Sequence, residues 1–162
     1  MLQIFKTLTQ YIGAAAAKVE SGRLFDEAKA LFDAGEHKQA LPVMKEAAEK
    51  GAPFAMAHLA VMCLKGLGTD CNWKRAAELY EMTLKLENFQ GTDFTSTTIK
   101  SHLGLIYGIG GYGLKRDTEK AKAYLKEAAD EGDERAGDTL KLVTQRKGVF
   151  GQKERARPEI KW

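Results

Sequence analysis

The chain carries one stretch twice, and this repetition is the feature that most constrains its fold. The first copy begins at His58-Leu59 and the second at His102-Leu103, so the two leucines are 44 residues apart. In both copies an apolar stripe leads into a cluster of glycines, and a second apolar stripe follows. Self-similarity at a fixed period of this length is typical of stacked helical repeats.

The first stripe of each copy has the spacing of a helix. Its residues stand at positions i, i+3 and i+4, which lie on one face of an α-helix. They are Leu59, Met62 and Cys63 in the first copy and Leu103, Ile106 and Tyr107 in the second. A small residue, Ala60 or Gly104, stands beside each stripe and predicts that the next helix approaches closely.

Each glycine cluster predicts the end of one helix and the start of another. The clusters are Gly66-Leu67-Gly68 and Gly111-Tyr112-Gly113, and glycine costs about 1 kcal/mol in a helix interior. Asn72 and Asp117 follow them, and both residue types are strong N-caps. The second stripes then contain Ala76, Leu79 and Tyr80 or Ala121, Tyr124 and Ala128. Each copy is therefore expected to fold as helix, glycine loop and helix.

This pattern resembles the Sel1-like repeat, a relative of the tetratricopeptide repeat. The residues that carry the best match are Leu103-Gly104, Tyr107, Gly111-Tyr112-Gly113, Asp117, Lys120-Ala121, Tyr124 and Ala128-Ala129. The copy at 55–86 departs from the pattern at Ala60, Cys63 and Thr83-Leu84. A third, looser copy upstream has a shorter loop and contains Gly35, Ala40, Ala47-Ala48 and Gly51. The resemblance covers residues 22–143 and implies a solenoid whose repeats serve many partners.

We therefore expect an all-α protein, a right-handed α-solenoid of antiparallel helix pairs, as a single domain over residues 1–146. The expected parts are an N-terminal capping helix over 1–20, repeats over 22–51, 53–86 and 97–132, a C-terminal capping helix over 134–146 and a basic tail over 147–162. Ser21-Gly22 is expected to break the chain before the first repeat. A signal peptide is the alternative for 1–20, but polar residues interrupt its apolar stretch and no basic segment precedes it.

Composition narrows the function. The formal net charge is only +3, which makes nucleic-acid binding unlikely, although the basic tail keeps salt-dependent binding of nucleic acid as an alternative. No run of about 18 apolar residues is present, so no membrane partner is expected. Cys63 and Cys71 do not form a disulfide framework. Free thiols fit a reducing compartment and predict a cytoplasmic protein, with a single bridge as the alternative.

The residues that could carry chemistry do not form a recognisable site. The glycine clusters follow no strand and precede no Gly-Lys-Ser/Thr, so they do not predict a phosphate loop. His37, His58 and His102 lack metal-ligand spacing. Cys63 could pair with a histidine as a nucleophile, but it replaces a core aromatic of the repeat and is expected to be buried. We expect no catalytic residue, cofactor or metal.

Binding is the expected activity, through the inner wall that the first helices line in such solenoids. The residues of these helices outside the packing stripe are the candidate partner-binding set. They are Phe25, Lys29, Phe32, Phe54, His58, Val61, Lys65, Ser101, Leu105 and Ile109. Apolar side chains among basic ones suit an acidic and apolar segment of another protein. An insertion at 87–96, with Phe89 and Phe94, either packs on neighbouring helices or contacts the partner, and the same two roles are open to the tail.

The expected function is that of a non-catalytic protein–protein interaction module, as a monomer or homodimer. The Sel1-like resemblance implies bacterial adaptors and immunity proteins that neutralise a secreted toxin. It also supplies an alternative, since some cysteine-rich relatives are associated with β-lactam binding or hydrolysis. Those relatives carry a cysteine pair in each repeat, whereas this chain has two cysteines in all.

Overall fold

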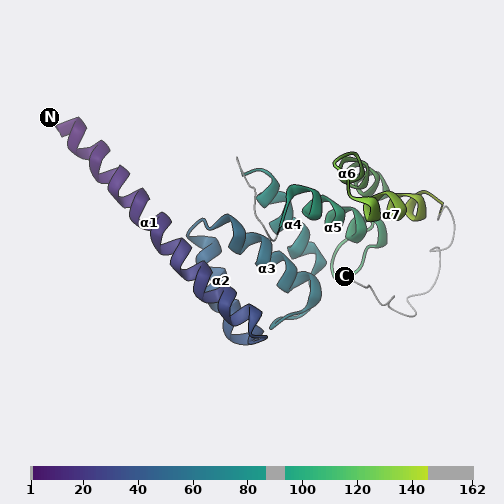
Figure 1. Cartoon of the computed structure of the whole chain (residues 1–162), viewed down its shortest axis with the longest axis horizontal. Coiled ribbons are helices and arrows are strands. Elements are labelled where there is room, and N and C mark those ends of the chain that lie inside the picture. The colour runs from purple at the N-terminus through teal and green to yellow at the C-terminus, as the bar shows by residue number, and fades with distance from the viewer. Residues whose placement is uncertain (1, 87–93, 146–162) are drawn as a thin grey trace.

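The structure, a computed structural model, describes residues 2–86 and 94–145, with side chains over 13–86 and 94–144. These residues form an elongated array of seven helices that follow one another from the N-terminal to the C-terminal end (Figure 1). The helices are α1 (Leu2–Asp33), α2 (His37–Glu49), α3 (Pro53–Lys65), α4 (Trp73–Leu84), α5 (Ser96–Ile109), α6 (Thr118–Asp130) and α7 (Glu134–Gln145). The predicted all-α solenoid is confirmed.

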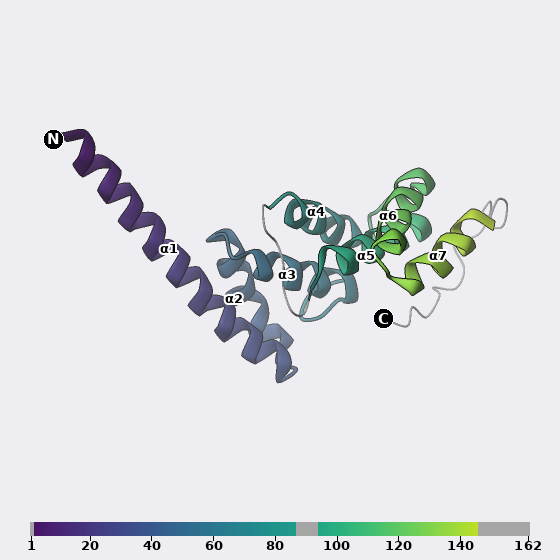
Figure 2. The ribbon, with the colours of Figure 1, turned by 45° about the horizontal axis from the view of Figure 1, so that its top comes forward.

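The helices pack as successive pairs. The C-terminal half of α1 lies against α2, α3 packs on α4, and α5 packs on α6 (Figure 2). The last helix, α7, contacts both α6 and α5. It turns Ala136 and Val143 into the core, and Leu140 packs against that core. The inward face of α7 therefore covers the C-terminal end of the core.

The predicted break at Ser21-Gly22 is wrong, because α1 continues through it as one helix of 32 residues. The Ser21 hydroxyl donates to the Lys18 carbonyl at 2.9 Å, which holds the serine within the helix. Arg23 pairs with Glu20 at 3.0 Å and with Glu27 at 3.3 Å along the exposed face. Four consecutive alanines upstream, at 14–17, also favour helix strongly. Together these contacts outweigh the cost of a single helical glycine.

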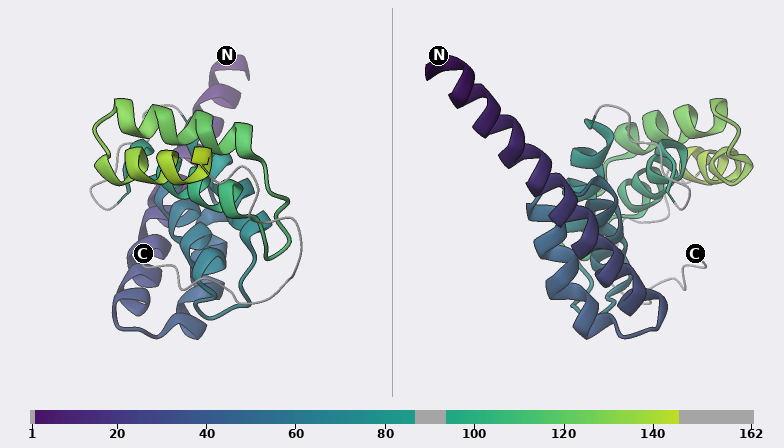
Figure 3. Two further views of the ribbon diagram at one scale, coloured as in Figure 1. Left: turned by 90° about the vertical axis from the view of Figure 1, so that its right-hand side faces the viewer. Right: turned by 60° about the vertical axis from the view of Figure 1, so that its left-hand side comes forward.

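The N-terminal part of α1 does not cover the first repeat, contrary to the expectation of a separate capping helix over 1–20. It extends beyond α2 and away from the remaining helices (Figure 3). The side chains of residues 13–19 are all exposed. Packing on α2 begins only at the buried residues Ser21, Leu24 and Ala28.

The two glycine loops have the predicted geometry. Asn72 Oδ1 accepts a hydrogen bond from the Arg75 amide at 2.9 Å, and Asp117 Oδ1 accepts one from the Lys120 amide at 3.0 Å. The Asn72 amide also donates to the Cys63 carbonyl at 2.8 Å, and the Asp117 amide donates to the Tyr107 carbonyl at 2.9 Å. The N-caps inferred from the sequence are therefore confirmed in both copies.

Each glycine loop also contacts the preceding repeat. A Cβ atom on Gly68 would lie 2.4 Å from the carbonyl oxygen of His37, the first residue of α2. In the next loop, the Tyr112 ring lies 4.9 Å from the ring of Trp73, the first residue of α4. The Trp73 amide donates to the Tyr112 carbonyl at 3.0 Å. The loops therefore join neighbouring repeats as well as turning the chain.

Candidate functional site

An aromatic cluster lies on the side of the first helices, α1, α3 and α5. We define it as Phe25, Phe32, Phe54, His58 and Phe94. The His58 ring is its centre, with centroids 5.2 Å from Phe25, 5.6 Å from Phe32 and 4.9 Å from Phe94. The Nδ1 atom of His58 lies 2.9 Å from the Phe54 carbonyl. The four phenylalanine rings are half-buried, so part of each side chain remains exposed to solvent.

Two of the predicted surface residues are buried, which corrects the expectation that they face a partner. His58 is 4% exposed and Val61 is 5% exposed. Every residue of α3 from Ala57 to Leu64 is buried, because other helices cover this helix on several sides. Helical phase alone did not show that Val61 belongs to the core.

The inserted segment contributes one residue to the cluster. Phe94 packs against His58, as expected if the insertion tucks an aromatic residue against neighbouring helices. Phe89 and the tail over 147–162 lie outside the described residues, so their predicted roles stay predictions.

The other predicted residues lie around the cluster or farther along the first helices. Lys29 pairs with Asp33 on α1 at 2.8 Å. Lys65 is exposed at the end of α3, while Leu105 and Ile109 are half-buried on α5. The Ser101 hydroxyl donates to the Asp133 carboxylate, which joins α5 to the turn before α7. The structure thus brings the phenylalanines together and spreads the remaining candidates along α3 and α5.

His102 occupies the repeat position that corresponds to His58, but its partner is a tyrosine. Its Nδ1 atom lies 3.0 Å from the Tyr80 hydroxyl, and the two rings are 5.6 Å apart. Burial lowers the pKa of His102 to about 4, with the positive charges of Lys65 and Arg135 acting in the same direction and Asp133 opposing them. Burial also raises the pKa of Tyr80. The pair is therefore neutral near pH 7.

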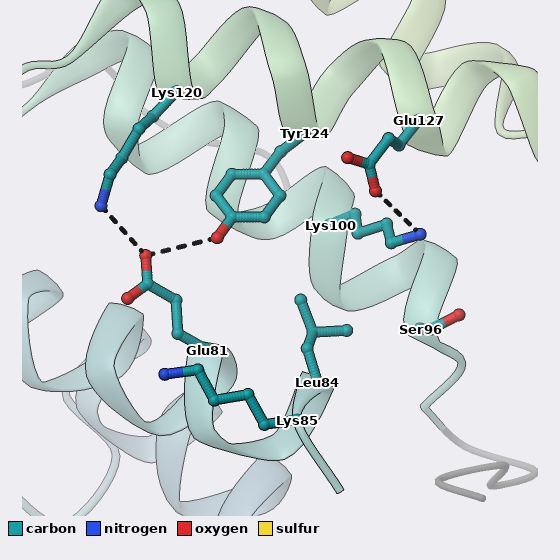
Figure 4. Close-up of a pocket in the computed structure, with 8 residues that line it drawn as sticks. All are labelled: Glu81, Leu84, Lys85, Ser96, Lys100, Lys120, Tyr124 and Glu127. Atoms are coloured by element: carbon teal, nitrogen blue, oxygen red, sulfur yellow. Dashed lines mark hydrogen bonds and ion pairs between the residues drawn. The ribbon is translucent and has the colours of Figure 1, made fainter. Parts of the chain in front are cut away.

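A second surface feature is a cleft of about 500 Å³ between α4, α5 and α6, which we call the second-helix cleft (Figure 4). It is lined by Glu81, Leu84, Lys85, Ser96, Lys100, Lys120, Tyr124 and Glu127. The C-terminal end of α4 and the N-terminal end of α5 form two of its walls, and α6 forms the third. None of its residues was among the predicted site residues.

Glu81 is the centre of the hydrogen bonds in this cleft. Its Oε1 atom accepts from the Tyr107 hydroxyl at 2.8 Å, from the Tyr124 hydroxyl at 3.4 Å and from Lys120 Nζ at 3.4 Å. Burial and the charge of Glu81 raise the pKa of Tyr124 to about 12. Tyr107, Lys120 and Tyr124 stand at positions of the repeat pattern, but Glu81 does not, so no motif indicated that they converge.

Lys100 closes the other end of the cleft. Its Nζ atom lies 3.1 Å from the Glu127 carboxylate and also pairs with Glu131. The Thr97 hydroxyl donates to the same Glu131 at 2.6 Å. These bonds tie the start of α5 to the end of α6 and hold the cleft open between them.

A larger groove, of about 650 Å³, lies between α2, α3 and α4. Both cysteines line it and form no disulfide with each other. Cys63 is 8% exposed, and burial raises the pKa of its thiol. The Cys71 thiol donates to the Leu64 carbonyl at 3.0 Å. Burial therefore disfavours the thiolate form of Cys63.

The part of the chain that the structure describes contains no group of three or more His, Cys, Asp or Glu residues that could hold a metal ion. Among the same residues, no helix is both long enough and apolar enough to cross a membrane.

The helix pairs and glycine loops define a helical-repeat protein of the solenoid class. A solved Sel1 repeat protein from Oxalobacter formigenes has a similar structure, with a TM-score of 0.57 and 22% sequence identity over 85% of this chain and 98% of that chain. A protective antigen of uropathogenic Escherichia coli with an SLR fold matches at a TM-score of 0.44 and 16% identity, over 83% of this chain and 36% of that one. No protein-family model and no curated protein matches the sequence.

The chain therefore has the fold of a Sel1-like repeat protein, as the sequence pattern predicted. A likeness at this level of identity shows the fold.

Proposed function

We propose that this protein binds a segment of a partner protein along its first helices, with the aromatic cluster as the apolar anchor. The observation that carries the proposal is the gathering of three half-buried phenylalanine rings, Phe25, Phe32 and Phe94, around His58. A fourth ring, Phe54, lies 5.9 Å from the Phe25 ring. Aromatic side chains are enriched in protein interfaces and provide much of their binding energy.

The proposed contact surface excludes the two buried candidates. It consists of Phe25, Phe32 and Phe54 in the cluster, with Lys29, Lys65, Ser101, Leu105 and Ile109 around it or farther along. His58 is buried beneath the phenylalanine rings that it contacts, and Val61 packs in the core. Apolar and basic groups together suit a partner segment that is apolar and acidic.

The experiment is an affinity pull-down from the native cell with the wild-type chain and with Phe32→Glu or Leu105→Glu. A carboxylate placed in an apolar contact is expected to weaken binding strongly, because the charge must be desolvated. Ala123→Glu is a matched control, since Ala123 is exposed on α6, away from the first helices. Circular dichroism establishes that each variant is folded. Retention of the partner by both folded test variants would remove the proposal.

A more specific form of the proposal is that the partner is a secreted bacterial toxin and that this protein is its cytoplasmic immunity protein. Its support is the Sel1-like resemblance alone. Co-expression with a neighbouring gene product tests it: the immunity role predicts co-purification and protection of the cell. A gene product that neither binds nor is neutralised excludes that pair.

The alternative is a β-lactam-binding or hydrolysing enzyme, as for the cysteine-rich relatives. In the structure Cys63 and Cys71 form no disulfide with each other, and no cysteine pair recurs from repeat to repeat. Incubation with a chromogenic β-lactam, read against a buffer blank, separates the two functions. Hydrolysis that is lost in Cys63→Ala and unchanged in Leu105→Glu would favour the enzyme.

A further inference from the structure

We propose that the projecting part of α1 is a dimerisation surface, on which α1 of a second copy of this chain lies antiparallel. The surface is a stripe of apolar residues that we call the α1 seam, defined as Phe5, Leu8, Ile12, Ala15 and Val19. These residues belong neither to the aromatic cluster nor to the second-helix cleft. The inference therefore goes beyond the function proposed above and does not depend on it.

The spacing of the α1 seam indicates another helix as its occupant. Its residues stand three, four, three and four positions apart in the sequence, and all of them lie within α1. Apolar residues that alternate at these two intervals form one narrow stripe on a helix, which is the stripe that packs in coiled coils. The next two positions of the same spacing are Gly22 and Asp26. The stripe therefore ends where α1 begins to pack on α2.

The seam lies on the side of α1 opposite to the side that packs on α2. The residues of α1 that are buried there include Leu24 and Ala28. Leu24 follows Val19 by five positions, which is about 140° around a helix. Val19 is 75% exposed, and Ala15 is also exposed. This part of α1 extends beyond α2 and away from the other helices (Figure 3), so the described end of the seam is open to a second chain.

The order of residue sizes along the seam makes it complementary to itself in one orientation. The large Phe5 stands toward its N-terminal end, and the small residues Ala15 and Gly22 stand toward its C-terminal end. An antiparallel second copy places Phe5 opposite Gly22 and Ile12 opposite Ala15, so that a large residue meets a small one in these layers. A parallel copy would place each residue opposite itself. Because the antiparallel pairing repeats across a two-fold axis, the same seam serves both copies.

The charges beside the seam favour the same orientation. Lys18 and Arg23 are exposed and stand at positions that flank the seam on its two sides. In a parallel pair, Lys18 of one copy would lie opposite Arg23 of the other, and these like charges repel. In the antiparallel pair, Lys18 lies opposite Tyr11 of the second copy, which is uncharged. This orientation also places the two solenoids at opposite ends of the helix pair, since each packs on the C-terminal half of its own α1 (Figure 2).

The length of the seam sets the expected strength of the dimer. Residues 2–20 of α1 extend over about 28 Å. They continue a helix whose C-terminal half is held by α2, so the cost of starting the helix is met within each chain. A contact of one short helix on another is at the small end of specific protein interfaces. A dissociation constant in the micromolar range is therefore expected.

The experiment measures the mass of the full chain in solution by sedimentation equilibrium, at loading concentrations from about 1 to about 100 μM. The wild-type chain is expected to change from the mass of one chain toward the mass of two as the concentration rises. The mass of a single chain at every concentration would overturn the proposal, and so would a mass well above that of two chains.

Ala15→Glu and Ala17→Glu are a matched pair of variants. Both alanines are exposed on α1, and both variants make the same change in charge and in helix propensity. Ala15 belongs to the seam, so its variant buries a carboxylate in the dimer and is expected to weaken dimerisation at least about tenfold. Ala17 lies about 160° away around the helix, and its variant is expected to stay within about twofold of wild type. Equal losses would contradict the proposal, and unfolding midpoints establish that both variants are folded.

Cross-linking tests the orientation. Chains with Leu8→Cys and chains with Val19→Cys, each in a Cys63→Ala and Cys71→Ala background, are mixed and mildly oxidised. Antiparallel pairing predicts mostly mixed dimers, because Leu8 lies opposite Val19 of the second copy. Dimers of each variant only with itself would mean a parallel pair and would overturn the proposed arrangement.

Two further measurements distinguish other uses of these surfaces. Leu105→Glu is expected to leave the dimer unchanged, and a loss of the dimer in this variant would assign self-association to α5 and overturn the inference. Sedimentation with vesicles of phosphatidylserine and phosphatidylcholine tests a membrane surface as the occupant. A chain that stays single and binds these vesicles, with binding lost in Ala15→Glu, would assign the seam to the membrane and also overturn the inference.

Discussion

The repeat formed by α3 and α4 and the repeat formed by α5 and α6 share one sequence pattern but differ in burial. All residues of α3 from Ala57 to Leu64 are buried, whereas Ser101, Leu105 and Ile109 of α5 remain partly exposed. The corresponding histidines also differ, since His58 lies among phenylalanine rings and His102 bonds to Tyr80. The neighbours of a repeat, and not its motif, therefore decide which side chains are available to a partner.

The same comparison applies to the position of Cys63 and Tyr107. In the earlier repeat this position is filled by a small buried thiol, and in the later one by a tyrosine whose hydroxyl donates to Glu81 of the preceding repeat. The tyrosine links α4, α5 and α6 through polar atoms, so the junction keeps an open, charged cleft. The groove at Cys63 also has charged residues in its lining, which are Lys45, Glu49, Asp70 and Arg75.

The largest expected difference between the repeats concerns the last glycine of each glycine cluster, Gly68 or Gly113. Gly68 has φ +70°, and a Cβ there would lie 2.4 Å from a backbone oxygen, while Gly113 has φ +82° with its nearest neighbour at 3.7 Å. Gly68→Ala is expected to cost about 2–5 kcal/mol, from backbone strain and overpacking. Gly113→Ala is expected to cost only about 1–2 kcal/mol. Urea unfolding measures both, and equal losses would contradict the proposed contact with His37.

The pH dependence of stability tests the environment of His102. Its pKa is about 4 in the folded protein, below the ordinary value of 6.5, so the unfolded chain binds the proton first as the pH falls. The contribution of His102 to the free energy of unfolding is fully present above pH 6.5. It decreases as the pH falls toward 4, by about 3 kcal/mol at most. Unfolding at pH 7 and pH 5 measures it. His102→Asn is expected to flatten this slope, and an unchanged slope would assign the effect to other groups.

The close approach of α5 and α6 is tested at Gly104. A Cβ on Gly104 would lie 2.4 Å from Leu125 Cγ, whereas the corresponding Ala60 has a Cβ and is fully buried. Gly104→Ala is expected to destabilise by about 1–3 kcal/mol through overpacking. Gly137→Ala is the control, because its nearest neighbour is 4.0 Å away and it should stabilise α7 by up to about 1 kcal/mol. Thermal unfolding that ranks the two variants in the opposite order would be inconsistent with this packing.

The smallest expected effect is at the Glu81 junction. Tyr107→Phe removes the 2.8 Å bond to Glu81 and is expected to cost about 0.5–1.5 kcal/mol. Tyr124→Phe removes a 3.4 Å bond and should cost less. Chemical unfolding of the two variants in parallel checks the order. A larger loss in Tyr124→Phe would mean that Glu81 is held chiefly from α6.

Local features of the fold could be predicted from the sequence, because each depends on a few neighbouring residues. Asn72 and Asp117 cap their helices, and the glycine clusters turn the chain as expected. The continuous helix through Gly22 could not be predicted in this way. A helical glycine is a modest cost that the alanines upstream and the ion pairs of Arg23 offset.

The candidate site was less predictable, because it depends on which repeats lie side by side. Helical phase placed Phe25, Phe32 and Phe54 on the first helices. In the structure Phe25 and Phe32 lie against the His58 ring, and Phe54 packs on Phe25. The same phase placed Val61 on the surface, although neighbouring helices bury it. Glu81 lies at the centre of the cleft because it accepts a hydrogen bond from Tyr107, which is 26 residues later in the chain. No spacing rule within one repeat predicts such a contact.

The most direct test of partner binding along the first helices is hydrogen–deuterium exchange of the protein alone and with the partner recovered by pull-down. The account predicts slower exchange on binding in the segments 25–33, 54–65 and 101–109, which contain the proposed contact residues. Protection confined to α2, α7 and the projecting part of α1, with no change in those three segments, would contradict it.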